Sequence, residues 1–273
     1  MRLFLSGLRK LVRRQATWVT LGLLVGLLVL IVVAVGATAN RPGASSAERA
    51  ATLSLVTFPG AYDVILSFIL GLGGLFAVIY GAAVAGSEWT FGTLKNAVAR
   101  GESRSRYTLL SFASIAVVIA VGLVVTFAIG VVAALVGATM AGTSTGGLTD
   151  AATLGRLPEQ FARGWVAIIE EGALGFAIAT LARSQLAGIG AGIGLYFGET
   201  FAGIFLPDIV KYLPFSVATA SVATGNSAGA GFGGSRASVA TLDANTALLL
   251  VVVWLVGALL VAALYTERAE IAG

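Results

Sequence analysis

The residues with the most chemical potential in this chain are carboxylates that lie within apolar stretches. Glu170 and Glu171 are adjacent in one such stretch, Glu199 lies in the next, and Asp63 begins an earlier one. The chain has no histidine and no cysteine, which excludes thiol chemistry and the usual zinc or haem ligand sets. Charged groups inside a membrane are costly and usually face a cavity or a partner. The four carboxylates therefore predict a translocation vestibule that attracts cations, with no catalytic residue and no metal site.

A structural interpretation of the same glutamates stays open. Neighbouring helical residues point about 100° apart, so Glu170 and Glu171 cannot share one neighbour equally. Two carboxylates this close in a poorly hydrated place do not both ionise easily, because burial and like charge each favour the neutral acid. We expect at least one of Glu170, Glu171 and Glu199 to face water inside the subunit or a dimer. Alternatively, protonated or paired glutamates hold their two segments together.

The elements that carry these carboxylates read as membrane spans. Of 273 residues, 58% are hydrophobic and 11% are charged, against about 25% charged in soluble domains. Crossing a bilayer takes about 20 mostly apolar residues. The sequence therefore predicts an all-α integral membrane protein in one transmembrane domain, with six spans at about 17–37, 62–86, 107–137, 161–181, 186–206 and 245–265. All five prolines fall outside these spans, as expected because helix interiors exclude proline.

The lysines and arginines predict the orientation. With the N-terminus inside, eleven of them lie on inner segments and six on outer segments. Positive charge is retained on the cytoplasmic side of membrane proteins. We expect a multi-pass protein of the cytoplasmic membrane with both termini in the cytoplasm.

Three segments outside the spans have distinct patterns. Residues 1–15 repeat apolar positions at helical spacing beside basic ones, which predicts an amphipathic helix at the inner interface. The outer connection 207–243 should hold a short helix over 207–220 and a mobile Gly-rich part over 224–238. The connection between spans three and four, about 141–160, is long and polar.

Glycines at four-residue spacing favour close helix packing. Gly190, Gly194 and Gly198 recur along the fifth span, and Gly22 and Gly26 lie in the first. Small residues at this spacing let helices approach closely in lipid. Ordinary packing within one subunit is the alternative to an interface between subunits.

The inner segment 87–103 is the most informative stretch. Ser87 is expected to cap a helix that carries Glu88 in its first turn, and Gly101 to end it. A short helix against the inner membrane face, followed by basic residues, suits the docking of a cytoplasmic partner. An ordinary basic loop is the alternative.

The same segment resembles a known motif. Glu88-x-x-x-Gly92-Thr93-Leu94-Lys95, followed by Ser103-Arg104, is similar to the inner motif of type-2 permeases of ATP-binding-cassette (ABC) exporters. The layout agrees, with an interfacial helix, six spans and a motif-bearing loop between spans two and three. The long connection over 141–160 departs from the family, where it is usually short.

The resemblance implies a permease subunit that moves a substrate with ATP hydrolysed elsewhere. Its partners would be a second permease, identical or different, and two nucleotide-binding ATPase subunits in which ATP and Mg are bound, with no cofactor in this chain. Spans one and five, with their glycines, would flank the permease–permease interface. The residues that the resemblance places in the coupling helix and its surroundings are Glu88, Trp89, Phe91, Gly92, Thr93, Leu94, Lys95 and Arg104.

The chain itself has no ATPase motif. Its only lysines, Lys10, Lys95 and Lys211, are followed by Leu, Asn and Tyr, so the phosphate-binding sequence G-x-x-x-x-G-K-[ST] does not occur. We therefore expect a non-enzymatic subunit bound to lipid and protein, without nucleic acid. An ion-coupled secondary transporter, with the glutamates carrying protons or sodium, is a competing function, although no inverted repeat or proline-broken helix pair is visible. A membrane assembly protein without transport is a third.

Overall fold

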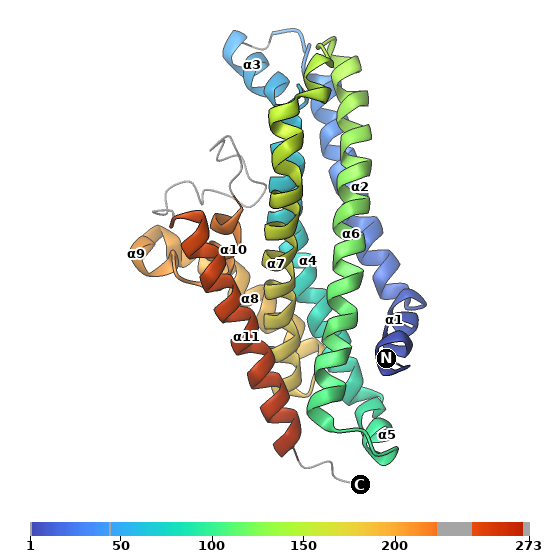
Figure 1. Cartoon of the computed structure of the whole chain (residues 1–273). Helices are drawn as coiled ribbons and strands as arrows, with labels where there is room; N and C mark the ends of the chain where they lie inside the picture. Colours follow the sequence, from blue (N-terminus) through green and yellow to red (C-terminus); the bar gives the residue numbers. More distant parts are fainter. Residues whose placement is uncertain (1, 44, 223–241, 270–273) are drawn as a thin grey trace.

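The computed structural model describes residues 2–43, 45–222 and 242–269, and every regular element in these ranges is helical (Figure 1). The elements are α1 (Arg2–Val12), α2 (Gln15–Thr38), α3 (Ser46–Ser54), α4 (Gly60–Thr90), α5 (Thr93–Ala99), α6 (Arg104–Ala141), the 3₁₀ turn η1 (Gly146–Thr149), α7 (Ala151–Ala182), α8 (Gln185–Phe205), α9 (Pro207–Val210), α10 (Pro214–Ser221) and α11 (Ala244–Arg268). Five of these helices, α2, α4, α6, α7 and α11, are long and apolar enough to cross a membrane. The predicted all-α, multi-pass membrane architecture is confirmed at this level.

Helix α4 is the centre of the bundle, with α7 against it along most of its length (Figure 1). The two backbones touch at glycines. A Cβ on Gly81 would lie 2.1 Å from the carbonyl oxygen of Gly172, and a Cβ on Gly175 would lie 2.1 Å from the carbonyl oxygen of Val78. Contacts this close are available only to glycine and hold helices together in lipid, where little hydrophobic driving force remains between them.

These contacts lead to a first prediction. Gly81→Ala should lower the thermal unfolding midpoint of the purified protein, because α4 and α7 must separate to admit the new methyl group. Overpacking of this kind typically costs about 1–3 kcal/mol. Gly257→Ala is the matched control, since a Cβ there meets nothing within 4 Å in the described chain and the residue belongs to no proposed interface. Equal midpoints for the two variants would contradict this packing.

The connection between α6 and α7 is shorter than the sequence predicts. Residues 141–160 are expected to be a polar connection, but α6 runs to Ala141 and α7 begins at Ala151. The carboxylate of Asp150 starts α7 by accepting a hydrogen bond of 2.8 Å from the backbone N–H of Thr153. The Thr153 hydroxyl donates to the same carboxylate at 2.6 Å. The hydrogen bonds from the hydroxyl and from the backbone N–H hold the pKa of the Asp150 carboxyl below its usual value. Pro158, predicted to lie in a connection, is inside the helix.

The hairpin formed by α6 and α7 has an exposed tip. The tip of the α6–α7 hairpin reaches beyond the level of α9 and α10, so the first turns of α7 are exposed (Figure 1). Pro158 has no N–H to donate within the helix, and in these exposed turns water can take the place of that donor. The sequence signal for a loop was real polarity, but it belongs to an exposed extension of a helix.

The segments outside the long helices follow the predicted pattern in part. The helix predicted over 1–15 is α1, which ends at Val12. The short helix predicted over 207–220 is divided into α9 and α10, because Pro214 starts a second helix. The segment predicted to be mobile, 224–238, lies outside the described residues.

Candidate functional site

The turn from α4 through α5 to α6 forms one end of the bundle, near α1 (Figure 1). The predicted helix start at Ser87 is wrong. Ser87 and Glu88 belong to the last turns of α4, and the Ser87 hydroxyl donates to the carbonyl oxygen of Val84. The chain breaks instead at Gly92, whose φ of 62° is in the left-handed region that glycine adopts without strain. The helix α5 then ends before Gly101, which has a φ of 86°, as the sequence predicts.

Glu88 is a buried junction of four helices. Its Oε1 accepts from the ammonium of Lys10 in α1 at 2.5 Å, and its Oε2 accepts from the hydroxyl of Tyr107 in α6 at 2.6 Å. The hydroxyl of Thr93, the first residue of α5, donates to the same Oε2. The carboxylate therefore connects α1, α4, α5 and α6, and it contacts the start of α5 from within α4 rather than from a cap position. We call Glu88, Lys10, Thr93 and Tyr107 the Glu88 junction.

The bend between α1 and α2 is fastened to α4 beside this junction. The guanidinium of Arg14 donates to the Ser87 hydroxyl at 3.0 Å and to the Ala83 carbonyl oxygen at 3.3 Å. One turn further, the hydroxyls of Thr17 and Tyr80 lie 2.8 Å apart in a buried hydrogen bond. A displacement of α5 would therefore also move the end of α4 and the α1–α2 bend.

Two further contacts tie the same end of the bundle to α7 and α11. The Arg183 guanidinium lies 5.1 Å above the Trp89 ring and donates through Nε to the Tyr265 hydroxyl at 3.1 Å. The guanidinium of Arg104 donates to the carbonyl oxygen of Ala269 at 2.6 Å. Trp89 and Arg104 thus contact other helices of this chain. The prediction that Trp89 belongs to the short inner helix is wrong, because Trp89 lies in the last turn of α4.

The remaining residues of the motif differ in exposure. Phe91 is 72% exposed on the turn before α5, whereas Leu94 is 4% exposed against the bundle. A Cβ on Gly92 would meet nothing within 4 Å, so within this chain the glycine serves the turn rather than a close approach. The side chain of Lys95 lies outside the described residues. The turn therefore presents one large apolar side chain, Phe91, away from the bundle.

The buried carboxylates lie in the interior of the helix bundle. Glu170 and Glu171 are 0% and 1% exposed in the middle of α7. A Cβ on Gly74 of α4 would overlap the carboxylate of Glu171, so that carboxylate fills the space left by the glycine. Both carboxylate oxygens of Glu170 have no hydrogen-bond partner within the described residues. The two glutamates thus have different surroundings, as their helical spacing requires.

Glu199 starts a helix elsewhere in the chain. Its carboxylate accepts from the backbone N–H groups of Phe215 and Ser216, at 3.2 and 2.5 Å, in the first turn of α10. Carboxylates favour this place because the first N–H groups of a helix lack partners within it. Glu199 is 3% exposed, so none of the three glutamates is exposed within the described chain, and the expectation that one of them faces water inside a dimer stays a prediction. Gly74 of α4 lies against Glu171, and the first turn of α10 lies against Glu199.

The two other charged residues of this region are apart from the glutamates. Arg163, the base nearest to them in sequence, donates to the carboxylate of Glu159 at 2.9 Å and to the side-chain oxygen of Asn245 at 2.8 Å. Asp63 is half-buried in the first turn of α4, where the helix dipole favours a carboxylate. Glu170, Glu171 and Glu199 are buried and Asp63 is half-buried, and their role in a translocation vestibule stays a prediction.

The predicted packing glycines point away from the chain. Within the described residues, a Cβ on any of them meets nothing within 4 Å; these residues are Gly22, Gly26, Gly190, Gly194 and Gly198. The row that packs internally is Gly188 and Gly192, where a Cβ would lie 2.4 Å from atoms of Ala179 and Val78 respectively. The same four-residue spacing was present in the sequence for this second row. The predicted row therefore leaves open space within the described chain, and its place at an interface between subunits stays a prediction.

Comparison with known proteins gives a family and no curated relative. A family model described as "Protein of unknown function (DUF2705)" matches residues 48–271. No curated protein matches the chain. The match covers α3 to α11 and includes the α4–α5–α6 turn, so the Glu88 junction, apart from Lys10, lies inside the matched region.

Proposed function

The chain belongs to the DUF2705 family of proteins of unknown function, and we propose that it is the permease subunit of an ATP-binding-cassette exporter. The α4–α5–α6 turn carries the proposal. A short helix, α5, lies at the end of the bundle, is fastened by the buried Glu88 to three other helices, and is preceded by the exposed Phe91. This arrangement suits a surface that receives force from a separate ATPase subunit.

We take α8 as the sixth span. Its 21 residues extend for about 32 Å at 1.5 Å per residue, close to the ~30 Å of a hydrocarbon core. The glycines and Glu199 lower its mean hydropathy, but Glu199 is buried and its outer face carries exposed apolar residues such as Phe197 and Phe201. Six spans would bring α1 and the end of α11 to the side of α5, and the distribution of lysine and arginine favours the cytoplasm for that side.

Cysteine labelling tests this topology on a natural background without cysteine. Ser46→Cys, at the start of α3, should react in intact cells with a membrane-impermeant maleimide, because the proposed topology puts it on the outer side. Ser103→Cys, directly before α6, should react only after the membrane is opened. Reaction of Ser103→Cys in intact cells would reverse the orientation.

The partners follow from the surfaces that this chain leaves open. We expect a second permease, identical or different, against the glycine faces of α2 and α8, which have open space at Gly22, Gly26, Gly190, Gly194 and Gly198. Two cytoplasmic nucleotide-binding subunits would receive α5 and hold ATP and Mg. Helix α1 would lie in the inner membrane interface, with its basic residues toward the lipid head groups.

The proposed coupling is mechanical and uses contacts within this chain. A push on Phe91 and α5 reaches Thr93, and through the Glu88 carboxylate it reaches α1, α4 and α6 together. The contact of Arg183 with Trp89 and Tyr265 passes the same motion to α7 and α11. The permease helices can then reorient as a unit when the ATPase subunits close.

Co-purification tests the proposal. When the chain is purified from the membranes of its own cells, a protein with a nucleotide-binding motif should accompany it and hydrolyse ATP. Phe91→Asp should abolish this association, because it places a charge at the exposed apolar contact. Leu154→Asp, on an exposed leucine at the far end of the bundle, should not. If no ATPase accompanies the wild-type chain, the proposal fails.

One observation favours a second candidate, the ion-coupled secondary transporter. Glu170 is fully buried in α7, and its carboxylate has no hydrogen-bond partner among the residues described. Buried carboxyl groups of this kind carry protons in some transporters. The two functions separate in membrane vesicles. Transport by the permease needs ATP and persists when ion gradients are dissipated, whereas transport by the second candidate stops.

A further inference from the structure

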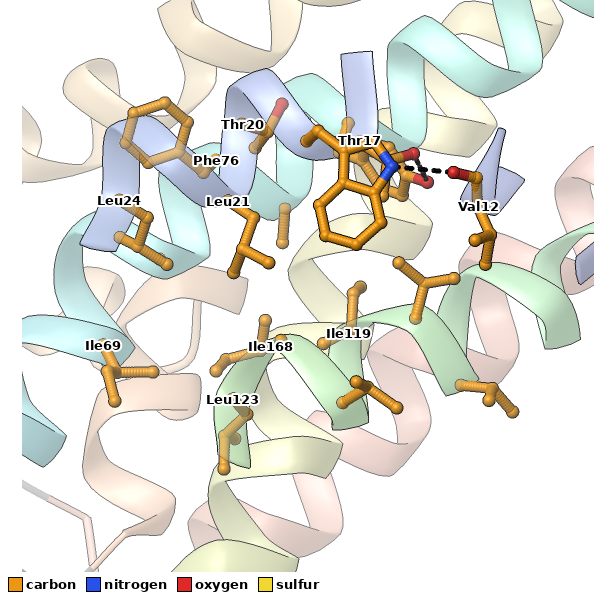
Figure 2. A pocket seen from close by; sticks show the side chains of 18 of the residues that line it. Val12, Thr17, Thr20, Leu21, Leu24, Ile69, Phe76, Ile119, Leu123 and Ile168 are labelled. Atoms are coloured by element: carbon orange, nitrogen blue, oxygen red, sulfur yellow. Dashed lines mark hydrogen bonds between the residues drawn. The ribbon is translucent and has the colours of Figure 1, made fainter. Parts of the chain in front are cut away.

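A groove beneath the α1–α2 bend is a candidate ligand site outside the α5 surface. It is a hollow of about 380 Å³ between α1, α2, α4, α6 and α7, and Figure 2 shows the side chains that line it. It runs from Val12 and Thr17 near the bend to Leu24, Ile69 and Leu123 deeper in the bundle (Figure 2). From Thr17 to Leu24 the helix rises about 10 Å at 1.5 Å per residue.

The wall of this groove is largely apolar, and all but one of its polar side chains are hydrogen-bonded within the chain. The Thr17 hydroxyl donates to the Leu11 carbonyl oxygen at 2.7 Å and is bonded to the Tyr80 hydroxyl. The indole N–H of Trp18 donates to the carbonyl oxygen of Val12 at 2.8 Å, drawn as a dashed line in Figure 2. Thr20 is the one polar lining residue of the described chain whose side chain has no hydrogen-bond partner. Such a wall suits a hydrocarbon chain and offers little to a polar solute.

Positive charge lies beside the mouth of the groove. Leu8 and Val12 line it, and the next residue after each is an arginine, Arg9 and Arg13. Residues four apart lie on one face of a helix, so the two arginines form a row next to the row that lines the groove. Both side chains are exposed, and neither guanidinium has an ion-pair or hydrogen-bond partner in the described ranges. Lys10 is instead paired with Glu88.

We propose that this groove binds one acyl chain of an anionic phospholipid, with the phosphate head group at Arg9 and Arg13. The long arginine stems can reach along the bend while their guanidinium groups stay at the head-group level. The volume has room for about a dozen chain carbons if each takes roughly the 30 Å³ that a water molecule takes in the liquid. The site is independent of the proposed ATPase partner, because none of its lining residues belongs to α5.

The position of the lipid gives it a structural consequence. The groove wall includes Thr17 and Tyr80, which join the α1–α2 bend to α4 about one turn from the contact of Arg14 with Ala83. A bound chain would fill the space between α2 and α6 and hold the bend against α4. Loss of the lipid should therefore loosen α1 without removing the Glu88 junction.

Native mass spectrometry of the purified full-length chain tests the proposal. After delipidation, the protein is mixed with phosphatidylglycerol and phosphatidylcholine that carry the same acyl chains. The wild type should retain one phosphatidylglycerol at least ~10-fold over phosphatidylcholine, as two membrane-facing arginines allow. Arg9→Gln/Arg13→Gln should reduce phosphatidylglycerol retention to the phosphatidylcholine level. Arg106→Gln, a change at an exposed arginine on α6, is the control and should change nothing.

A second variant fills the groove and leaves the charges in place. Gly122 lines it, and a Cβ there would meet only Leu21 at 3.8 Å, so Gly122→Leu should occupy the space without disturbing the fold. It should reduce retention of both lipids, whereas Gly257→Leu, on α11 with open space, should not. Retention of phosphatidylglycerol by Gly122→Leu at the wild-type level would overturn the proposal. Equal retention of the two lipids by the wild type, or retention of a different apolar molecule in their place, would also overturn it.

Discussion

Glu88→Ala should leave the chain in the membrane and separate it functionally from the proposed ATPase subunit. The substitution removes the acceptor of the Lys10 ammonium, the Tyr107 hydroxyl and the Thr93 hydroxyl at one time. A buried donor left without an acceptor costs about 1–3 kcal/mol. The part that belongs to Lys10 is smaller, because that side chain is 43% exposed and its ion pair is screened by water. The start of α5 loses its fixed position even though the long helices keep their apolar contacts.

The measurement is the rate of ATP hydrolysis by the purified complex, compared between the wild-type permease and the Glu88→Ala variant. We expect the stimulated rate to fall at least ~10-fold, which corresponds to about 1.4 kcal/mol. Glu102→Ala is the matched control, because it removes a carboxylate from the same turn that has no side-chain partner in the described chain. Glu88→Gln keeps an acceptor for the two hydroxyls and should fall between. Equal losses from Glu88→Ala and Glu102→Ala would show that only the charge of the turn matters.

Glu199→Leu and Glu170→Leu should have opposite effects on stability. Glu199→Leu removes the acceptor of two backbone N–H groups in the first turn of α10, which should cost about 2 kcal/mol or more. Glu170→Leu removes a fully buried carboxyl group that makes no hydrogen bond in the described residues. Replacing a buried polar group by an apolar one of similar size is often neutral or stabilising. Thermal unfolding midpoints of the two purified variants measure the difference.

Transport by glutamine variants separates structure from function at the same residues. If Glu170 serves a cation-attracting vestibule, Glu170→Gln should assemble normally and lose transport. Glu199→Gln keeps one acceptor oxygen for α10 and should be tolerated. Full transport by the variant that combines Glu170→Gln, Glu171→Gln and Glu199→Gln would eliminate the vestibule. A lower midpoint for Glu170→Leu than for Glu199→Leu would contradict the structural assignment.

The sequence predicts the long apolar helices well because hydropathy over 20 residues is a property of the segment alone. Helix ends were less accessible. Polarity over 141–160 suggests a loop, yet Asp150 caps a helix that continues through Pro158. At the α5 turn, Ser87 has the composition of a cap, but the left-handed backbone at Gly92 decides where α4 ends. Each error concerns the exact residue at which a helix begins or ends, and composition does not determine that residue.

The candidate site needed information from distant parts of the chain. Lys10 and Tyr107 meet Glu88 only because α1 and α6 pack beside the end of α4. No local spacing announces this. The glycines show the same limit. Gly188 and Gly190 have equal chemistry and the same four-residue periodicity, and only the rotation of α8 against α7 decides which row is inside.

Cross-linking from α5 tests the central claim most directly. A photoreactive amino acid in place of Asn96, an exposed residue of α5, reports what touches this helix in the membranes of the cells that make the protein. The account predicts an adduct between the chain and a protein with a nucleotide-binding motif, and none from the same probe at Ser144, in the turn between α6 and α7. Adducts from Asn96 that contain only lipid or this chain itself would contradict the claim that α5 docks on an ATPase.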